Sequence, residues 1–249
     1  MKTYKIIFSP TGGTEKVANA ITSNWDSTEI IDLSINNKDY NISLEEDSLA
    51  LIAMPSFGGL APQLALDRLS KIKANGCKCA IVAVYGNRAY DDTLIQMMDY
   101  SEKAGFQVVA AISAVAEHSI IRNYASDRPN ANDCKQLADY GNKIIEKATI
   151  SSDSITVPGN RPYKKAGAAM VPKANKTCTN CGACAKVCPS GAIDLSNPRV
   201  VDKSKCIGCM RCTSVCPAKA RSINPIMAKV AALALKKACS VPKENELFI

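Results

Sequence analysis

The sequence is poor in histidine and has no long apolar run. His118 is the only histidine among 249 residues, so no mixed Cys/His zinc site and no Ser/His/Asp, Cys/His or paired-carboxylate hydrolytic arrangement is apparent. The longest apolar stretches, Val108–Ala116 and Val230–Leu235, are far shorter than the about 20 residues of a membrane-spanning helix. Met1–Pro10 lacks the charged head and apolar core of a signal peptide. We therefore expect a cytoplasmic protein with no membrane partner.

Cysteine, in contrast, is abundant. The chain has 12 cysteines, which in a secreted domain would suggest a disulfide framework, but a chain without a signal is kept reduced. Eight of them lie between Cys178 and Cys216, and such crowding in a reducing compartment indicates metal. The other four stand singly, and we expect them to be buried as small apolar side chains: Cys77, Cys79, Cys134 and Cys239.

The crowded cysteines form two runs of the same spacing, C-x2-C-x2-C-x3-C-P, offset by 28 residues. This is the bacterial [4Fe–4S] run, in which three thiolates hold one cube and the fourth reaches the other cube. Zinc ribbons instead use widely separated Cys-x2-Cys pairs. The spacing predicts one cluster on Cys178, Cys181, Cys184 and Cys216, and a second on Cys206, Cys209, Cys212 and Cys188. The segment from about 173 to 225 resembles the dicluster bacterial ferredoxins.

Strand-like and helix-like periods alternate over the first 148 residues. The expected strands are Lys5–Phe8, Glu29–Leu33, Leu49–Met54, Cys79–Tyr85 and Phe106–Val115. The expected helices begin at Thr14, cover Pro62–Lys73 and Thr93–Lys103, and include the apolar positions from Cys134 to Ile145. Strands separated by helix-length segments form βαβ units. We therefore predict an α/β, doubly wound, five-stranded parallel sheet, followed by a small α+β cluster domain.

The loop after the first strand, Ser9-Pro10-Thr11-Gly12-Gly13-Thr14, is suited to a phosphate. Its glycines allow a nest of backbone N–H donors at a helix start, and the hydroxyls of Ser9, Thr11 and Thr14 add further donors. It lacks the lysine of a nucleotide P-loop and the G-x-G-x-x-G of a dinucleotide site. The loop resembles the S/T-x-T-G-x-T loop of the flavodoxins, which binds the phosphate of FMN.

The resemblance implies a flavodoxin-like sheet of order 2-1-3-4-5, in which ligands lie past the carboxyl ends of strands 1, 3 and 4. Two more loops follow such strands. We expect FMN contacts from Ser56, Phe57, Gly58 and Gly59 after the third strand, and from Tyr85, Gly86, Asn87, Arg88 and Tyr90 after the fourth. Phe57 and Tyr90 would cover the flavin ring, with plain surface packing as the alternative for each. For His118, a structural or surface role is favoured over a proton relay.

Breaker-rich composition divides the chain. We expect a flavodoxin-like FMN-binding domain over 1–148, a linker or strap over 149–175, a 2[4Fe–4S] ferredoxin domain over 176–225, and a C-terminal tail with a short helix over 226–249.

Charge is unevenly distributed along the chain. Residues 1–150 hold 15 Lys and Arg against 18 Asp and Glu, whereas residues 151–249 hold 16 against 5. Nucleic acid is not an expected partner, because the lysines are scattered and no aromatic residues alternate with them. Two oxidised clusters would each bring about −2 and offset part of the excess. The alternatives are a solvated basic face and docking of an acidic redox protein, such as a ferredoxin-type donor or acceptor.

From residue 3 to about 225 the chain resembles the flavodoxin–dicluster ferredoxin fusion proteins of anaerobic bacteria. The resemblance implies an electron carrier that passes electrons between FMN and two clusters and couples one- and two-electron redox pools of protein partners. One alternative is a flavin-dependent reductase of a small oxidant such as a quinone or an enone, and another is a redox sensor. No residue is assigned a catalytic role.

Overall fold

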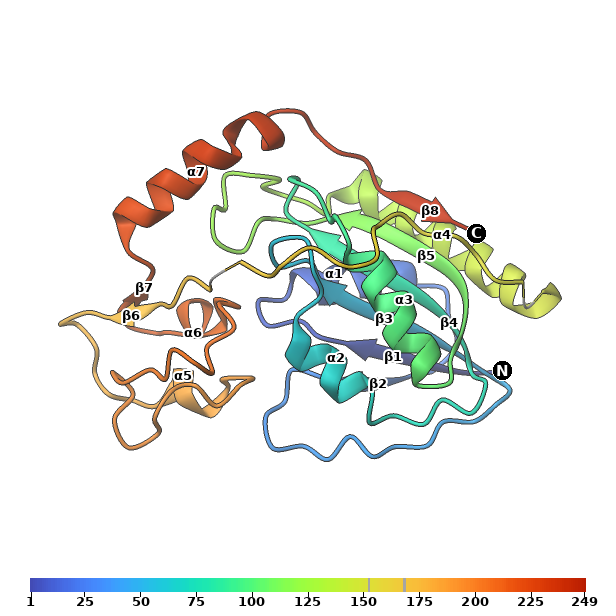
Figure 1. Cartoon of the computed structure of the whole chain (residues 1–249), viewed down its shortest axis with the longest axis horizontal. Helices are drawn as coiled ribbons and strands as arrows, with labels where there is room; N and C mark the ends of the chain where they lie inside the picture. The colour runs from blue at the N-terminus through green and yellow to red at the C-terminus, as the bar shows by residue number, and fades with distance from the viewer. Residues whose placement is uncertain (152, 168) are drawn as a thin grey trace.

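A six-stranded sheet forms the centre of this computed structural model, which describes residues 1–151, 153–167 and 169–249 (Figure 1). Its strands are β1 (Lys2–Ile7), β2 (Thr28–Asp32), β3 (Ser48–Pro55), β4 (Lys78–Tyr85), β5 (Gln107–Val115) and β8 (Glu246–Phe248), in the order β2-β1-β3-β4-β5-β8. The first five are parallel and have the order 2-1-3-4-5, which is that of the flavodoxin-like doubly wound fold. The predicted fold class is confirmed.

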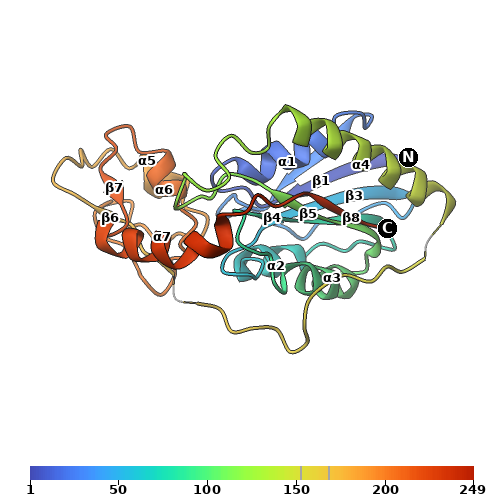
Figure 2. The same cartoon turned by 90° about the horizontal axis from the view of Figure 1, so that it is seen from above.

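Four helices cover the two faces of the sheet. α1 (Gly13–Ile21) and α4 (Ala131–Ile150) lie on one face, and α2 (Gln63–Leu69) and α3 (Thr93–Lys103) lie on the other (Figure 2). β3 and β4 are buried on both sides, which explains why they read as continuous apolar runs. α1 and α4 touch at Gly141, where a Cβ atom would lie 1.9 Å from the carbonyl oxygen of Ile21.

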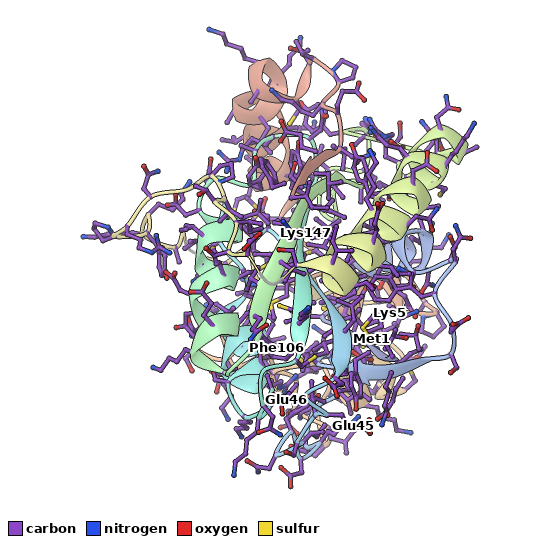
Figure 3. All side chains as sticks on the ribbon, turned by 90° about the vertical axis from the view of Figure 1, so that its right-hand side faces the viewer. Met1, Lys5, Glu45, Glu46, Phe106 and Lys147 are labelled. Carbon is purple, nitrogen blue, oxygen red and sulfur yellow. The ribbon has the colours of Figure 1, made fainter. Side chains whose placement is uncertain are left out.

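The carboxyl ends of the parallel strands face the cysteine-rich half of the chain. Figure 3 views the molecule from the opposite end. Met1, Glu46 and Phe106, which precede β1, β3 and β5, are labelled there, so the amino ends of these strands face the viewer. Ligands of doubly wound sheets bind at the carboxyl ends. The cysteine-rich half is therefore stacked on the end of the sheet at which a ligand is expected.

A small separate unit, called here the cysteine unit, extends over residues 173–222. It consists of a two-stranded antiparallel ribbon, β6 (Lys173–Ala174) with β7 (Arg221–Ser222), and two single-turn helices, α5 (Ala183–Lys186) and α6 (Arg211–Ser214). Each short helix follows a residue in the left-handed conformation, Gly182 or Met210, which turns the cysteine loop into the helix.

The segment before the cysteine unit is called here the strap; its described residues are 151, 153–167 and 169–172, and its middle part passes beside α3 (Figure 2). Asp92 accepts hydrogen bonds from the backbone amides of Asn160 at 2.9 Å and Lys164 at 2.7 Å. Arg161 pairs with Asp99, its Nε lying 2.9 Å from Oδ2. Within the predicted linker, positions 152 and 168 lie outside the described residues. The remainder of the strap is held against the sheet domain over its middle part.

The chain returns to the sheet after the cysteine unit. α7 (Pro225–Cys239), capped by the Asn224 side chain, leads back to β8, which pairs antiparallel with β5. The sheet thus has one strand more than the five predicted, because three residues in a tail carry no period that identifies a strand. α7 is also longer than the short helix that was expected. No helix of the described residues has the length and apolar character to span a bilayer.

Candidate functional site

A cavity of about 440 Å³ lies at the carboxyl ends of β1, β3 and β4, a volume in the range of small-molecule sites. The predicted residues that line it are Thr11, Gly13, Thr14, Ser56, Phe57, Gly58, Tyr85 and Gly86. The rest of its wall includes residues from three other segments: Ala169 and Met170 of the strap, Ile207 and Gly208 of the second cysteine run, and Ala231 and Leu235 of α7. The cavity is therefore shared by both halves of the molecule.

The Ser9–Thr14 loop forms one end of this cavity. Gly12 has a φ of 90° and precedes the first residue of α1, a conformation that glycine adopts without strain. The first amides of a helix have no intrahelical acceptor and carry the positive end of its dipole. Ser9 lies outside the lining, because its hydroxyl accepts a hydrogen bond from the Glu15 amide at 2.9 Å. Ser9 and Gly12 shape the loop, while Thr11, Gly13 and Thr14 face the cavity.

The loop after β3 turns sharply at Phe57, whose amide donates to the Leu60 carbonyl at 2.8 Å. Gly59 is not in the cavity lining. A Cβ atom there would lie 2.0 Å from Asp91 Oδ2, so this glycine allows the loop to pack on the start of α3. The predicted contact between Gly59 and the ligand stays a prediction.

The loop after β4 supplies Tyr85 and Gly86 to the cavity, but its next residues have other partners. The Asn87 side chain is buried, and its amide nitrogen donates to the carbonyls of Cys239 and Val241 at 3.0 Å each. Arg88 pairs with Asp91. The Tyr90 hydroxyl lies 3.1 Å from Glu246 Oε2 of β8. The returning tail and the start of α3 thus bind the side chains of Asn87, Arg88 and Tyr90, and their contact with a flavin stays a prediction.

His118 lines the cavity and is packed on Gly86. Its Nδ1 accepts hydrogen bonds from the amides of Ile120 and Ile121, both at 3.2 Å. Burial lowers the pKa of this imidazole below its ordinary value. A neutral ring with one nitrogen committed to the backbone fits the structural role that the sequence favoured.

The eight crowded cysteines line two small cavities, divided in the manner that the spacing predicts. The first cysteine set, around one cavity, is Cys178, Cys181, Cys184 and Cys216. The second cysteine set, around the other, is Cys188, Cys206, Cys209 and Cys212. The fourth cysteine of each run thus joins the first three of the other run, which is the crossover that two cubanes require.

The donor chemistry of both cavities fits anionic clusters. Burial raises the pKa of the Cys209 thiol to about 11 and that of the Cys212 thiol to about 12, so their thiolates need a bound cation, which a metal centre supplies. Nη1 of Arg211 is buried without a hydrogen-bond acceptor beside the second cysteine set, and sulfur of a cluster would provide one. Among the described residues, no three His, Cys, Asp or Glu side chains gather as they would around one metal ion.

Residues 177–220 match the family described as a 4Fe-4S dicluster domain. Similar solved structures include a short-chain flavodoxin associated with a non-canonical PDU bacterial microcompartment, at 17% identity and a TM-score of 0.41, covering 59% of this chain and 99% of that one. Flavodoxin 2 of Bacillus cereus is 14% identical with a TM-score of 0.44, and the match covers 59% of this chain and 99% of that one. A flavodoxin of Fusobacterium nucleatum bound to flavin mononucleotide is 18% identical with a TM-score of 0.40, and the match covers 59% of this chain and 98% of that one.

No curated protein matches the sequence. The fold assignment rests on the strand order, which is independent of these low identities. The cysteine assignment rests on the family match and on the two four-cysteine cavities. The chain combines a flavodoxin-like domain with a ferredoxin-like 4Fe-4S dicluster domain.

Proposed function

We propose that this protein transfers electrons between FMN, bound in the large cavity, and two [4Fe–4S] clusters on the two cysteine sets. One observation supports the proposal above all others. Ile207 lines both the large cavity and the cavity of the second cysteine set. A flavin and a cluster at these places would be separated by little more than one side chain.

FMN is the ligand that the large cavity suits. The amides at the start of α1, with the hydroxyls of Thr11 and Thr14, offer donors to a terminal phosphate. Another part of the wall is apolar and includes Met170, Ile207 and Leu235, which is the surface that an aromatic ring requires. A flavin accepts one or two electrons and each cluster carries one, so two clusters together hold what a fully reduced flavin releases.

The proposed route has an order. Cys188, Cys206, Cys209 and Cys212 would hold the second cluster, and Ile207 would be the side chain between that cluster and FMN, across which electrons would pass. The cavity of the first cysteine set shares no lining residue with the large cavity, and Cys181 in that set is exposed. The first cluster would therefore be the point of exchange with a partner protein.

We propose an acidic redox protein as that partner, and the cytoplasm of an anaerobic bacterium as the setting. Residues 203–243 contain no Asp or Glu and nine Lys or Arg, so the half of the molecule that carries the clusters attracts a negatively charged surface. Eight of the 12 cysteines would act as thiolate ligands, and thiols are kept reduced in the cytoplasm.

The test begins with cofactor content. Anaerobically prepared protein should contain about eight iron and eight sulfide per chain, and its extracted flavin should be FMN. Stoichiometric zinc without sulfide, or FAD in place of FMN, would contradict the proposal.

The second step measures the route. After rapid mixing with a one-electron reductant, reduced flavin should appear in wild type and fail to appear in Cys209→Ser, which removes a ligand of the second cluster. Protein that instead turns over quinones or enones rapidly, with no transfer to a protein acceptor, would favour the flavin reductase.

A further inference from the structure

Arg221 is a buried charge between the two cysteine sets. It stands in β7, only 4% of its surface is exposed, and it lines both cysteine cavities. Among the residues that the structure describes, no other has a guanidinium group on both of these cavities. An arginine side chain keeps its charge in proteins, so a full positive charge lies at this point of the cysteine unit.

The contacts of Arg221 leave that charge without a counter-charge from the protein. Nε donates to the Cys184 sulfur at 3.2 Å, and the two terminal nitrogens donate to the carbonyls of Pro172, at 3.5 Å, and Pro198. None of the ion pairs formed by the described residues includes Arg221. A buried charge is costly unless a group of opposite sign lies beside it. The thiolates of the cysteine sets are the anions in reach.

We propose that Arg221 is the shared counter-ion of the two clusters and sets their reduction potentials apart. One-electron reduction takes a four-thiolate cluster from about −2 to about −3, so a nearby positive charge favours the reduced state. Hydrogen bonds to the ligand sulfurs act in the same direction. Both potentials are raised by the charge, and that of the first cluster is raised more, because only its ligand Cys184 accepts the Nε–H bond.

This arrangement gives the electron route a direction, and the inference rests on the proposed function. Arg221 therefore shifts the electron of the partly reduced protein toward the first cluster, next to the proposed partner. Arg211 lines only the cavity of the second cysteine set and is the same in wild type and in the Arg221 variants, so the variants report the contribution of Arg221 alone.

The experiment is a mediated redox titration of anaerobically prepared holoprotein, followed by EPR. In Arg221→Met, which keeps most of the volume and removes the charge, the potential of the first cluster should fall by about 59 mV or more, equivalent to a tenfold change in its equilibrium constant for one electron. The second cluster should fall by less. The control is Arg199→Met, since Arg199 is exposed and donates to the Cys178 carbonyl at 3.0 Å, and water screens its charge. Both potentials should stay near their wild-type values there.

Unchanged potentials in an Arg221→Met protein that retains eight irons would overturn the inference. If that variant cannot hold its clusters, Arg221→Lys decides, because it keeps the charge and loses the Nε–H bond. The potential of the first cluster should then fall by an amount equivalent to a several-fold change in its equilibrium constant, while the potential of the second cluster stays unchanged. Two unchanged or equally shifted potentials would overturn the inference. Failure of the proposed function looks different, since wild type would then lack iron–sulfur clusters or FMN, or would turn over quinones without transfer to a protein acceptor, and none of these outcomes depends on the residue at position 221.

Discussion

Gly86 marks the point at which β4 meets the large cavity, and His118 occupies the space beside it. A Cβ atom on Gly86 would lie 2.6 Å from the His118 ring and 2.7 Å from its Cβ. The pairing joins the loop after β4 to the loop after β5, which are consecutive walls of the cavity. Neither residue could be paired from the sequence, because 31 positions separate them and neither belongs to a motif.

We expect Gly86→Ala to lower the free energy of unfolding by about 1–3 kcal/mol, because a methyl group must displace the packed imidazole. The same change at Gly167 is the control, since a Cβ atom there meets nothing within 4 Å. Urea unfolding midpoints of the two variants measure the difference. Equal midpoints would contradict the packing described for His118.

The buried imidazole also predicts a pH dependence. Burial lowers the pKa of His118 in the folded protein, so between about pH 6.5, the ordinary value, and the lower folded value the unfolded chain binds more protons. Stability then falls as the pH falls through this window. The variant His118→Asn has no imidazole to titrate, so its free energy of unfolding does not have this pH dependence. Relative to wild type, its free energy of unfolding should be higher at pH 5.5 than at pH 7.5. A difference that does not change with pH would show that the ring is freely protonated.

Sequence spacing predicted those site residues whose roles are local. The cysteine sets follow from fixed offsets, and Thr11, Gly13 and Thr14 follow from a strand–loop–helix pattern. The partners of the Asn87 and Tyr90 side chains could not be predicted, because they lie about 150 residues further along, in the tail. From the sequence, a side-chain amide or hydroxyl in a loop that binds a ligand cannot be distinguished from one that binds a distant part of the same chain.

At the scale of elements, helix α3 was predicted to the residue, since it lies between Asp92 and Gly105, which ends the turn with a φ of 91°. α2 ends at Leu69, four residues before the predicted limit at Lys73, because Lys71 and Ile72 close three-residue turns back to Arg68 and Leu69. An apolar period continues through such turns and does not reveal them.

The strap depends on one buried carboxylate. Asp92 is 3% exposed and accepts three hydrogen bonds from Asn160 and Lys164. We expect Asp92→Ala to speed amide exchange at residues 157–167 by about tenfold or more, because several bonds that hold the strap are lost together. Asp67→Ala is the control, since that exposed carboxylate bonds only to Gln63. Hydrogen exchange followed by mass spectrometry measures both. Unchanged exchange in the first variant would mean that the bonds of Arg161 and Tyr163 to Asp99 and of Lys164 to Asp91 are sufficient to hold the strap.

At the scale of the whole molecule, the cysteine unit is attached to the sheet domain on both sides. The strap leads into it across α3, and α7 with β8 leads out of it onto β5 (Figure 1). Asn245 fixes the return, its side chain accepting from the Val115 amide at 2.9 Å and donating to Asp133 at 3.0 Å. Sequence patterns alone allowed a mobile linker between two independent domains, because they do not show that the C-terminal segment pairs with the sheet of the first domain.

The charge distribution predicts a salt effect on partner encounter. The outer side of α7 carries Lys229, Lys236 and Lys237, all exposed. We expect the rate of electron uptake from an acidic ferredoxin to fall steeply between about 0.05 and 0.5 M salt, since attraction between surfaces is screened over about 8 Å at physiological ionic strength. The double change Lys229→Glu with Lys236→Glu should slow uptake and leave cofactor content intact.

The control for that experiment is Lys103→Glu with Lys143→Glu, which makes the same charge change on exposed positions of the sheet domain. Uptake should remain close to wild type there. A rate that is independent of salt, or equal slowing by both pairs, would indicate that no basic surface of the cysteine half guides the partner.

The antiparallel pairing of β8 with β5 also bears on how the protein is made. Translation delivers β5 long before β8, and the cysteine unit comes between them. A nascent chain therefore leaves the ribosome with the outer edge of β5 uncovered, and an uncovered edge strand pairs readily with other chains. Ordering of the cysteine unit brings β8 back toward that edge. A cell short of iron would then be expected to accumulate this polypeptide as aggregates, and chaperone demand would rise with iron limitation.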